Sequence, residues 1–450
     1  MEKITPRRTA SAKRFGLGIL IGSALLASGP SLVWDQTPSS AAPAQAAAAA
    51  DPLQLRQVDG GPEYFAKYPK SLPADPSYFP IGVWLESLME PTDAPKDHLV
   101  GINLYVDLTS SSDITFATNQ GMRALTSNPV SGAVGWVIAD EPDMWAGPGD
   151  APWTRNWPGA GPICTPETER CGYTIQREMR KGIPTGQLVY ANYGKGVTFW
   201  ETNEQASIFV NEFQDVVSAD DYWFTDPYIC GPSEGGAVLA AGAELSPEKC
   251  RLAANYGWTV DRVRSLVQPA MSKPVWAFVE VGHPFTDPKA PTISGPEVRA
   301  AVWSSLIHGA RGIVYFNHNF GGACLSQHVL RESCGDAVRP WVTDVNGQIN
   351  RLAPVLNAPF LDNALSHGEG VDAAVKVHDG SLYVLAGSAQ AGQQDALFQM
   401  SCLAGADAAV TVLDENRTVA MTKGVFSDHF ADGNAVHLYR VDGAAASCVR

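Results

Sequence analysis

The stretch Val134-Gly-Trp-Val-Ile-Ala-Asp-Glu-Pro-Asp-Met-Trp145 decides the fold, because an apolar run ends abruptly in acidic residues. The run 134–139 predicts a strand buried on both faces, as in a parallel sheet. Pro142 has no backbone N–H to donate to a ladder, so the strand must end before it. Asp140 and Glu141 therefore lie at the C-terminal edge of the strand, where parallel α/β barrels carry their active sites.

Similar apolar runs recur along the chain, with helical stretches between most of them. The predicted strands are 79–85, 101–106, 122–125, 134–139, 188–192, 216–222, 275–279 and 312–316. The clearest helices are 247–271 and the amphipathic segment 296–309, whereas the connection 125–134 has a short helix or none. Helices between strands impose parallel pairing, and eight such units predict a (β/α)8 TIM barrel.

A doubly wound open sheet is the competing fold. No GxGxxG motif follows the first strand, so nothing points to a dinucleotide, and no cofactor is expected. From about Ala358 the pattern changes to short alternating runs, and Asp379-Gly380 marks a hairpin. We therefore expect a signal peptide (1–46), a linker leading into the barrel (47–75), the barrel (76–357) and a C-terminal antiparallel β-sandwich (358–450).

The N-terminus has the pattern of a bacterial export signal. Basic residues precede an uncharged apolar run over 15–27, and Ala44-Gln45-Ala46 offers a small-x-small cleavage site. The run is shorter than the ~20 residues needed to span a bilayer, which predicts a secreted protein without stable membrane insertion rather than one with a retained anchor. The sequence leaves Sec and Tat export open. A net charge of -15 argues against nucleic-acid binding.

Eight cysteines in an exported chain predict disulfides. They fall as neighbours along the sequence, and sequential pairing is favoured: Cys164 with Cys171, Cys230 with Cys250, Cys324 with Cys334, and Cys402 with Cys448. No CxxC or histidine pair has zinc spacing, so no metal is expected. The oligomeric state cannot be read from these patterns.

A second stretch, Pro274-Val-Trp-Ala-Phe-Val-Glu-Val-Gly282, places Glu280 near the end of another apolar strand. Two carboxyl groups at strand ends of one barrel are the minimum for glycoside hydrolysis, where one protonates the leaving oxygen and the other attacks carbon or activates water. The register of the strands could instead favour Glu86, and Asp220 and Asp221 are alternative carboxylates.

A glutamate after the fourth strand and another on the seventh resemble glycoside hydrolase clan A, the four/seven superfamily of TIM-barrel retaining glycosidases. The segments 309–316, 424–430 and 436–439 are also similar to that clan. The resemblance implies that Glu141 is the acid/base, that Glu280 is the nucleophile, and that the substrate is a polysaccharide or oligosaccharide. Asp140 departs from the clan, which usually has asparagine there.

Polar and aromatic residues near the predicted strand ends are candidates for sugar contacts, because aromatic faces stack on sugar rings. These candidates are Asp140, Glu86, Trp84, Trp145, Asp221, Tyr222, Tyr228, His283 and Asn317. Repulsion within the acidic cleft predicts a mildly acidic activity optimum. Two other functions remain: a non-catalytic carbohydrate-binding or cell-envelope protein, and a weaker case for a metal-dependent hydrolase using Asp140, Glu141 and Asp143.

Overall fold

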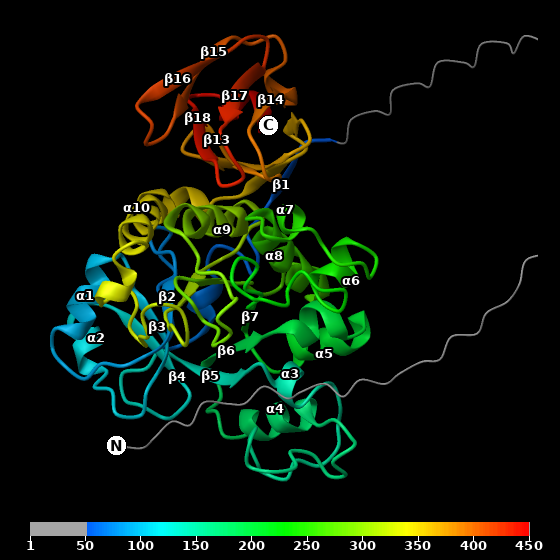
Figure 1. Ribbon diagram of the computed structural model, residues 1–450. Coiled ribbons are helices and arrows are strands. Elements are labelled where there is room, and N and C mark those ends of the chain that lie inside the picture. The colour runs from blue at the N-terminus through cyan, green and yellow to red at the C-terminus, as the bar shows by residue number, and fades with distance from the viewer. Residues whose placement is uncertain (1–51, 450) are drawn as a thin grey trace, which may run out of the picture.

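The computed structural model describes residues 52–449, which form a parallel barrel beside a group of antiparallel strands (Figure 1). The expected signal peptide lies outside these residues. The barrel strands are β2 (Ile81–Glu86), β3 (Leu104–Leu108), β4 (Arg123–Thr126), β5 (Gly135–Asp140), β6 (Leu188–Tyr193), β7 (Val216–Ala219), β8 (Ala277–Glu280) and β9 (Ile313–Phe316). They pair in the order β7-β6-β5-β4-β3-β2-β9-β8, and a parallel bridge between Val217 and Val275 closes the ring. The predicted (β/α)8 barrel is confirmed.

Helices connect most of the barrel strands and pack on the outside of the ring (Figure 1). They are α1 (Asp93–Leu99), α2 (Thr115–Asn119), α4 (Gly172–Arg180), α5 (Asn203–Glu212), α8 (Ala254–Leu266), α9 (Gly295–Ile307) and α10 (Arg339–Leu356). The connection between β4 and β5 has no helix, as expected. The single helix expected over 247–271 is wrong in extent. It divides into α7 (Pro247–Cys250) and α8, because Arg251 leaves the helical conformation next to the Cys230–Cys250 disulfide.

The barrel interior is filled by large side chains from alternate strand positions. The rings of Trp84 and Phe278 have centroids 5.5 Å apart, and those of Tyr190 and Trp276 lie 5.3 Å apart. These four side chains are buried. A barrel packed in this way has no central pore, so we look for an active site at the C-terminal ends of its strands.

The C-terminal strands form two antiparallel sheets beside α9 and α10 (Figure 1). One sheet has the order β1-β10-β12-β13-β18-β15-β16 and the other has the order β11-β14-β17. Their bounds are β1 (Gln54–Arg56), β10 (Phe360–Asp362), β11 (Leu365–His367), β12 (Val371–His378), β13 (Ser381–Ser388), β14 (Gln394–Met400), β15 (Ala408–Val412), β16 (Arg417–Met421), β17 (Val425–Phe430) and β18 (Val436–Val441). The predicted hairpin at Asp379-Gly380 joins β12 to β13.

The structure differs from the expected linker at its first described residues. Gln54 to Arg56 form strand β1, which pairs with β10 of the C-terminal sheet, and Arg56 Nε lies 2.7 Å from Asp362 Oδ2. The alternation of the C-terminal runs is visible in sequence, but a three-residue strand has too short a pattern to be recognised. Within residues 52–449, no helix is both long enough and apolar enough to cross a membrane.

All four disulfides connect neighbouring cysteines, as predicted, and no cysteine of the described chain is free. Three of them staple loops of the barrel, and Cys402–Cys448 closes the C-terminal region. We expect the protein, unfolded without a reductant, to show no reactive thiol. Full reduction should then add one hydrogen mass per cysteine in an intact-mass measurement. More than two free thiols before reduction would contradict the four-bridge arrangement.

Candidate active site

Glu141 directly follows strand β5 and has an unusual backbone conformation. Its φ is 50°, in the left-handed region, and its N–H donates to the carbonyl oxygen of Asn192 at 3.0 Å. Pro142 then opens the short helix α3 (Pro142–Trp145). A left-handed residue other than glycine costs roughly 1–2 kcal/mol, so the surrounding packing must hold it. This conformation directs the Glu141 carboxyl across the rim, toward the ends of β6 and β7.

Three carboxyl groups form what we call the acidic cluster: Asp140, Glu141 and Asp220. The carboxyl groups of Glu141 and Asp220 lie close enough for the charge of Glu141 to act on Asp220. Asn192 Nδ2 donates to Asp140 Oδ1 at 3.2 Å, and the Tyr222 hydroxyl donates to Asp220 Oδ2 at 2.9 Å. The ends of β5, β6 and β7 thus bring these groups together from distant parts of the sequence.

The acidic cluster cannot carry a full charge on every carboxyl group. Burial, followed by repulsion from Asp140 and Asp143, raises the pKa of Glu141 to about 8, although Lys195 opposes the rise. Burial and the charges of Glu141 and Asp140 raise the pKa of Asp220 well above its usual range. The cluster therefore retains protons at neutral pH, which is the property of a general acid.

The loop after β6 packs against the acidic cluster and binds the neighbouring carboxylate of Asp143. Asp143 accepts hydrogen bonds from the backbone N–H groups of Gly194 at 3.0 Å and Val197 at 2.9 Å. A Cβ at Gly194 would lie 2.9 Å from Glu141 Oε1, so the backbone approaches the carboxyl closely. Lys195 Nζ lies within 2.8 Å of a carboxylate oxygen of Glu234. Sequence reasoning missed Lys195, although two glycines flank it directly after a strand.

Glu280 ends strand β8 and has 0% exposed surface. Thr225 Oγ1 donates to its Oε1 at 3.0 Å, and the hydroxyl of Tyr256 lies 2.8 Å from each of its oxygens. Burial raises its pKa to about 7, although the bonds from Tyr256 and Thr225 lower it. These neighbours differ from those of Glu141, and the expected pairing of the two glutamates remains a prediction. Tyr256 comes from α8, and its role has no signal in the sequence.

A pocket next to the acidic cluster is lined by tryptophans. Its walls include Trp84, Asp140, Trp145 and Trp157, and it encloses ≈ 590 Å³, including its open mouth. Trp145 Nε1 donates to the backbone carbonyl oxygen of Asp140 at 2.8 Å, which anchors its ring to the end of β5. The Trp145 and Trp157 rings lie 5.5 Å apart, and Trp157 is 45% exposed. These rings offer apolar faces suited to sugar stacking.

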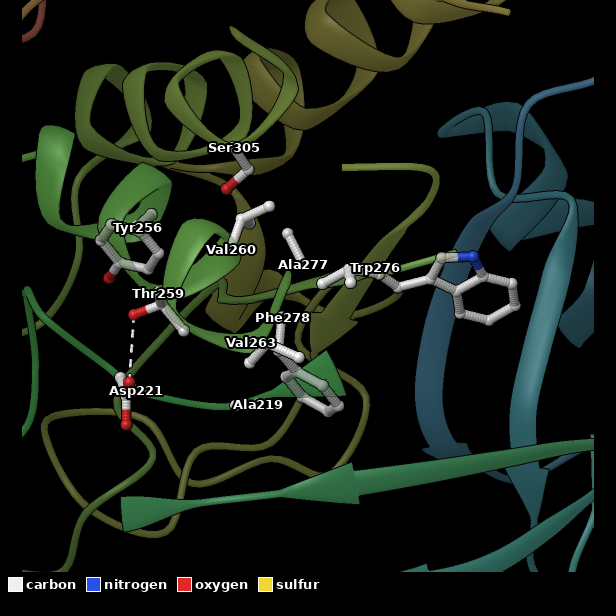
Figure 2. A pocket seen from close by; sticks show the side chains of 11 residues that line it. Ala219, Asp221, Tyr256, Thr259, Val260, Val263, Trp276, Ala277, Phe278 and Ser305 are labelled. Carbon is white, nitrogen blue, oxygen red and sulfur yellow. Dashed lines mark hydrogen bonds between the residues drawn. The ribbon is translucent and has the colours of Figure 1, made fainter. Parts of the chain in front are cut away.

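The side chain of Asp221 points away from the acidic cluster, although Asp221 is adjacent to Asp220 in sequence. It is 1% exposed, and the hydroxyls of Thr198 and Thr259 donate to its two oxygens at 3.0 Å. Figure 2 shows Asp221, Thr259 and Tyr256 around a largely apolar internal cavity between α8 and β8. Asp221 could contact a sugar, as predicted, only if the hydroxyls of Thr198 and Thr259 were displaced from its carboxylate.

The other predicted contact residues are spread along the rim. Tyr222 is buried and holds Asp220, whereas Tyr228 is 64% exposed. Glu86 is fully buried, and Asn317 Nδ2 donates to its Oε2 at 2.6 Å. His283 is also buried, and its Nδ1 lies 2.8 Å from Thr292 Oγ1. Sugar binding by these residues remains a prediction.

Among residues 52–449, no group of three or more His, Cys, Asp or Glu side chains is arranged to hold a metal ion. No protein-family model matches the sequence, and no curated protein does.

Several solved structures resemble the chain at low identity. A glycoside hydrolase family 5 protein from Bacteroides vulgatus shares 13% identity with a TM-score of 0.47, over 83% of this chain and 91% of that one. A GH30 endoxylanase from Clostridium papyrosolvens C71 shares 10% identity with a TM-score of 0.42, over 87% of this chain and 100% of that one. An α-amylase from Geobacillus thermoleovorans, solved with acarbose, shares 8% identity with a TM-score of 0.46, over 80% and 98% of the two chains. Because one barrel fold hosts many activities, function must be argued from the side chains.

The retained proton of Glu141 has a consequence for stability. Its pKa rises from 4.5 to about 8, so its contribution to stability is fully present below pH 4.5 and is lost as the pH rises through 8. We expect Glu141→Gln to remove this loss and to be more stable than the parent at pH 8.5 by about 1–3 kcal/mol, with a smaller difference at pH 5.5. Urea unfolding at the two pH values measures this. The exposed Glu244→Gln is the matched control, and equal pH dependence in all three proteins would contradict the burial of a protonated Glu141.

Proposed function

We propose that the protein is an exported glycoside hydrolase that cleaves a polysaccharide or oligosaccharide with retention of anomeric configuration. Glu141 is the acid/base and Glu280 is the nucleophile. The observation that carries the proposal is the carboxyl of Glu141, which keeps its proton to about pH 8 beside a tryptophan-lined pocket at the barrel rim. Disulfides are typical of oxidising compartments, which supports export.

The reaction has two steps that use the same two side chains. Glu141 first transfers its proton to the glycosidic oxygen while the bond from that oxygen to the anomeric carbon breaks. The Glu280 carboxylate bonds to the same carbon, which gives a glycosyl ester. Glu141, now ionised, then takes a proton from a water molecule whose oxygen attacks the carbon and releases Glu280. This chemistry requires a carboxyl separation of about 5–5.5 Å across the bound sugar.

Asp220 is the rival of Glu280 as nucleophile, because it also lies at a strand end near Glu141. Burial and the charges of Glu141 and Asp140, however, raise the pKa of Asp220 well above its usual range, and a protonated carboxyl cannot act as the nucleophile. We assign Asp220 to holding Glu141 in place. Asp140 accepts hydrogen bonds, which suits a sugar hydroxyl, and the rings of Trp145 and Trp157 suit the sugar faces.

Matched alanine variants separate these roles. Glu280→Ala should lose at least ~100-fold in turnover, and azide should restore it by forming a glycosyl azide of inverted configuration. Asp220→Ala should lose activity without azide rescue. Glu141→Ala should retain most activity on aryl glycosides with good leaving groups, since these need little protonation. NMR determines the anomeric configuration of the glycosyl azide. If azide rescued Asp220→Ala but not Glu280→Ala, the nucleophile would be Asp220.

The pH profile follows from the two carboxyl groups. Glu280 must be ionised, which holds above its pKa of about 7, and Glu141 must be protonated, which holds below about 8. We expect a bell-shaped kcat/KM profile with a near-neutral maximum, rather than the mildly acidic optimum expected from sequence. Asp140→Asn removes a charge that raises the pKa of Glu141, so the alkaline limb should move to lower pH. A limb that does not move would show that Asp140 and Glu141 are uncoupled.

A non-catalytic carbohydrate-binding protein is the second candidate. One observation favours it: Glu280 has no exposed surface, so a sugar could reach it only after the rim opens. A panel of chromogenic glycosides and polysaccharides distinguishes the two functions. Retention on a polysaccharide affinity gel without turnover of any substrate would support binding alone, and Trp157→Ala should then weaken the retention.

A further inference from the structure

A group of buried charges lies where the barrel meets the C-terminal strands, far in sequence from the acidic cluster. Lys376 of β12 is 1% exposed, and its Nζ lies 3.5 Å from the ring centroid of Phe360. Arg311, just before β9, is 3% exposed. Arg264, near the end of α8, places its Nε 2.6 Å from Asp59 Oδ2. We call Asp59, Arg264, Arg311 and Lys376 the junction cluster.

Each cation of the junction cluster has a buried donor atom without an acceptor. Lys376 Nζ, Arg311 Nε and Arg264 Nη2 find no hydrogen-bond partner among residues 52–449. Arg311 uses Nη1 for a bond of 3.4 Å to the backbone oxygen of Asp59. Buried polar groups are almost always hydrogen-bonded, and a buried unpaired cation is costlier still.

The charges of the junction cluster do not balance. Three cations face the single carboxylate of Asp59. Asp261 adds a second carboxylate at the edge, 2.8 Å from Arg264 Nη1, but it is 49% exposed. With Lys376 protonated, one cation remains uncompensated even when Asp261 is counted. Burial lowers the pKa of Lys376 most, and the charges of Arg311, Arg56 and Arg264 lower it further against the opposing charge of Asp59, so the cluster lacks the negative charge that would keep Lys376 protonated.

We propose that the junction cluster binds a small inorganic anion, which accepts hydrogen bonds from Lys376, Arg311 and Arg264. Buried water could satisfy the donors, but it would leave the excess positive charge in place. The anion would connect β12 of the C-terminal sheet to the barrel through Arg311 and α8. A surface groove lined by Arg56, Arg264 and Phe360 touches the junction cluster at Arg264. Chloride and phosphate share the required chemistry.

Thermal unfolding at constant ionic strength tests the proposal. Chloride and phosphate are titrated separately into the full-length protein, with sodium methanesulfonate as the balancing salt. A specific anion should raise Tm saturably, on the order of 2–4 °C between 1 and 100 times its Kd. Lys376→Met should abolish this rise, and Lys289→Met, which removes an exposed cation on the barrel, should preserve it. The anion whose titration raises Tm is the ligand of the junction cluster.

Bromide gives a direct measurement that does not depend on a folded variant. Crystals of the parent protein soaked in bromide should show anomalous density within ~4 Å of Lys376 Nζ and Arg311 Nε if chloride is the ligand, and a phosphate ligand should appear there as tetrahedral density. Asp59 Oδ1 also lacks a partner, so Lys376 could pair with it directly. In that case Tm would not depend on either anion, the density would be absent, and the proposal would be overturned.

Discussion

The burial of Glu141 and Asp220 beside each other is the constraint on which the rim of the barrel depends. Their burial and mutual repulsion make the doubly ionised state costly, so at least one of the two carboxyl groups keeps its proton. The left-handed backbone at Glu141, the hydroxyl of Tyr222 and the close approach of Gly194 all serve to hold that pair. The buried pair thus keeps at least one proton at neutral pH, whereas most carboxyl groups on a protein surface are ionised there.

Glu280 is held in a different way, and the difference matters for its chemistry. Its two oxygens accept from Thr225 and Tyr256, and these neutral donors partly offset the burial that raises its pKa to about 7. Tyr256 belongs to α8, outside the ring of strands. The outer layer of helices therefore contributes directly to a strand-end carboxyl group, and changes in α8 can reach the rim without altering any loop.

Much of the fold could be predicted from the sequence, because buried strands must be apolar and each barrel strand appears as an apolar run. The residues around the candidate site were harder to assign. Asp220 and Asp221 are consecutive, so the alternation of a strand would direct them to opposite sides, but only their contacts in the structure show that Asp220 lies beside Glu141 and that Asp221 bonds to Thr198 and Thr259. Lys195 and Tyr256 were missed because their roles depend on tertiary contacts. The break before α8 follows the disulfide-bonded Cys250 and leaves no mark in the helical pattern of the sequence.

The pairing of β1 with β10 has a consequence for how the chain folds. Arg56 and Asp362 form an ion pair across 306 positions of sequence, so the edge of the C-terminal sheet is completed by the start of the described chain. Contacts of such long range raise the contact order and slow folding, because the loop must close before the contact stabilises it. Among the described strands β1 is synthesised first, and its partner β10 is synthesised only after the whole barrel. The pairing of β1 with β10 therefore cannot form until the barrel sequence has been made.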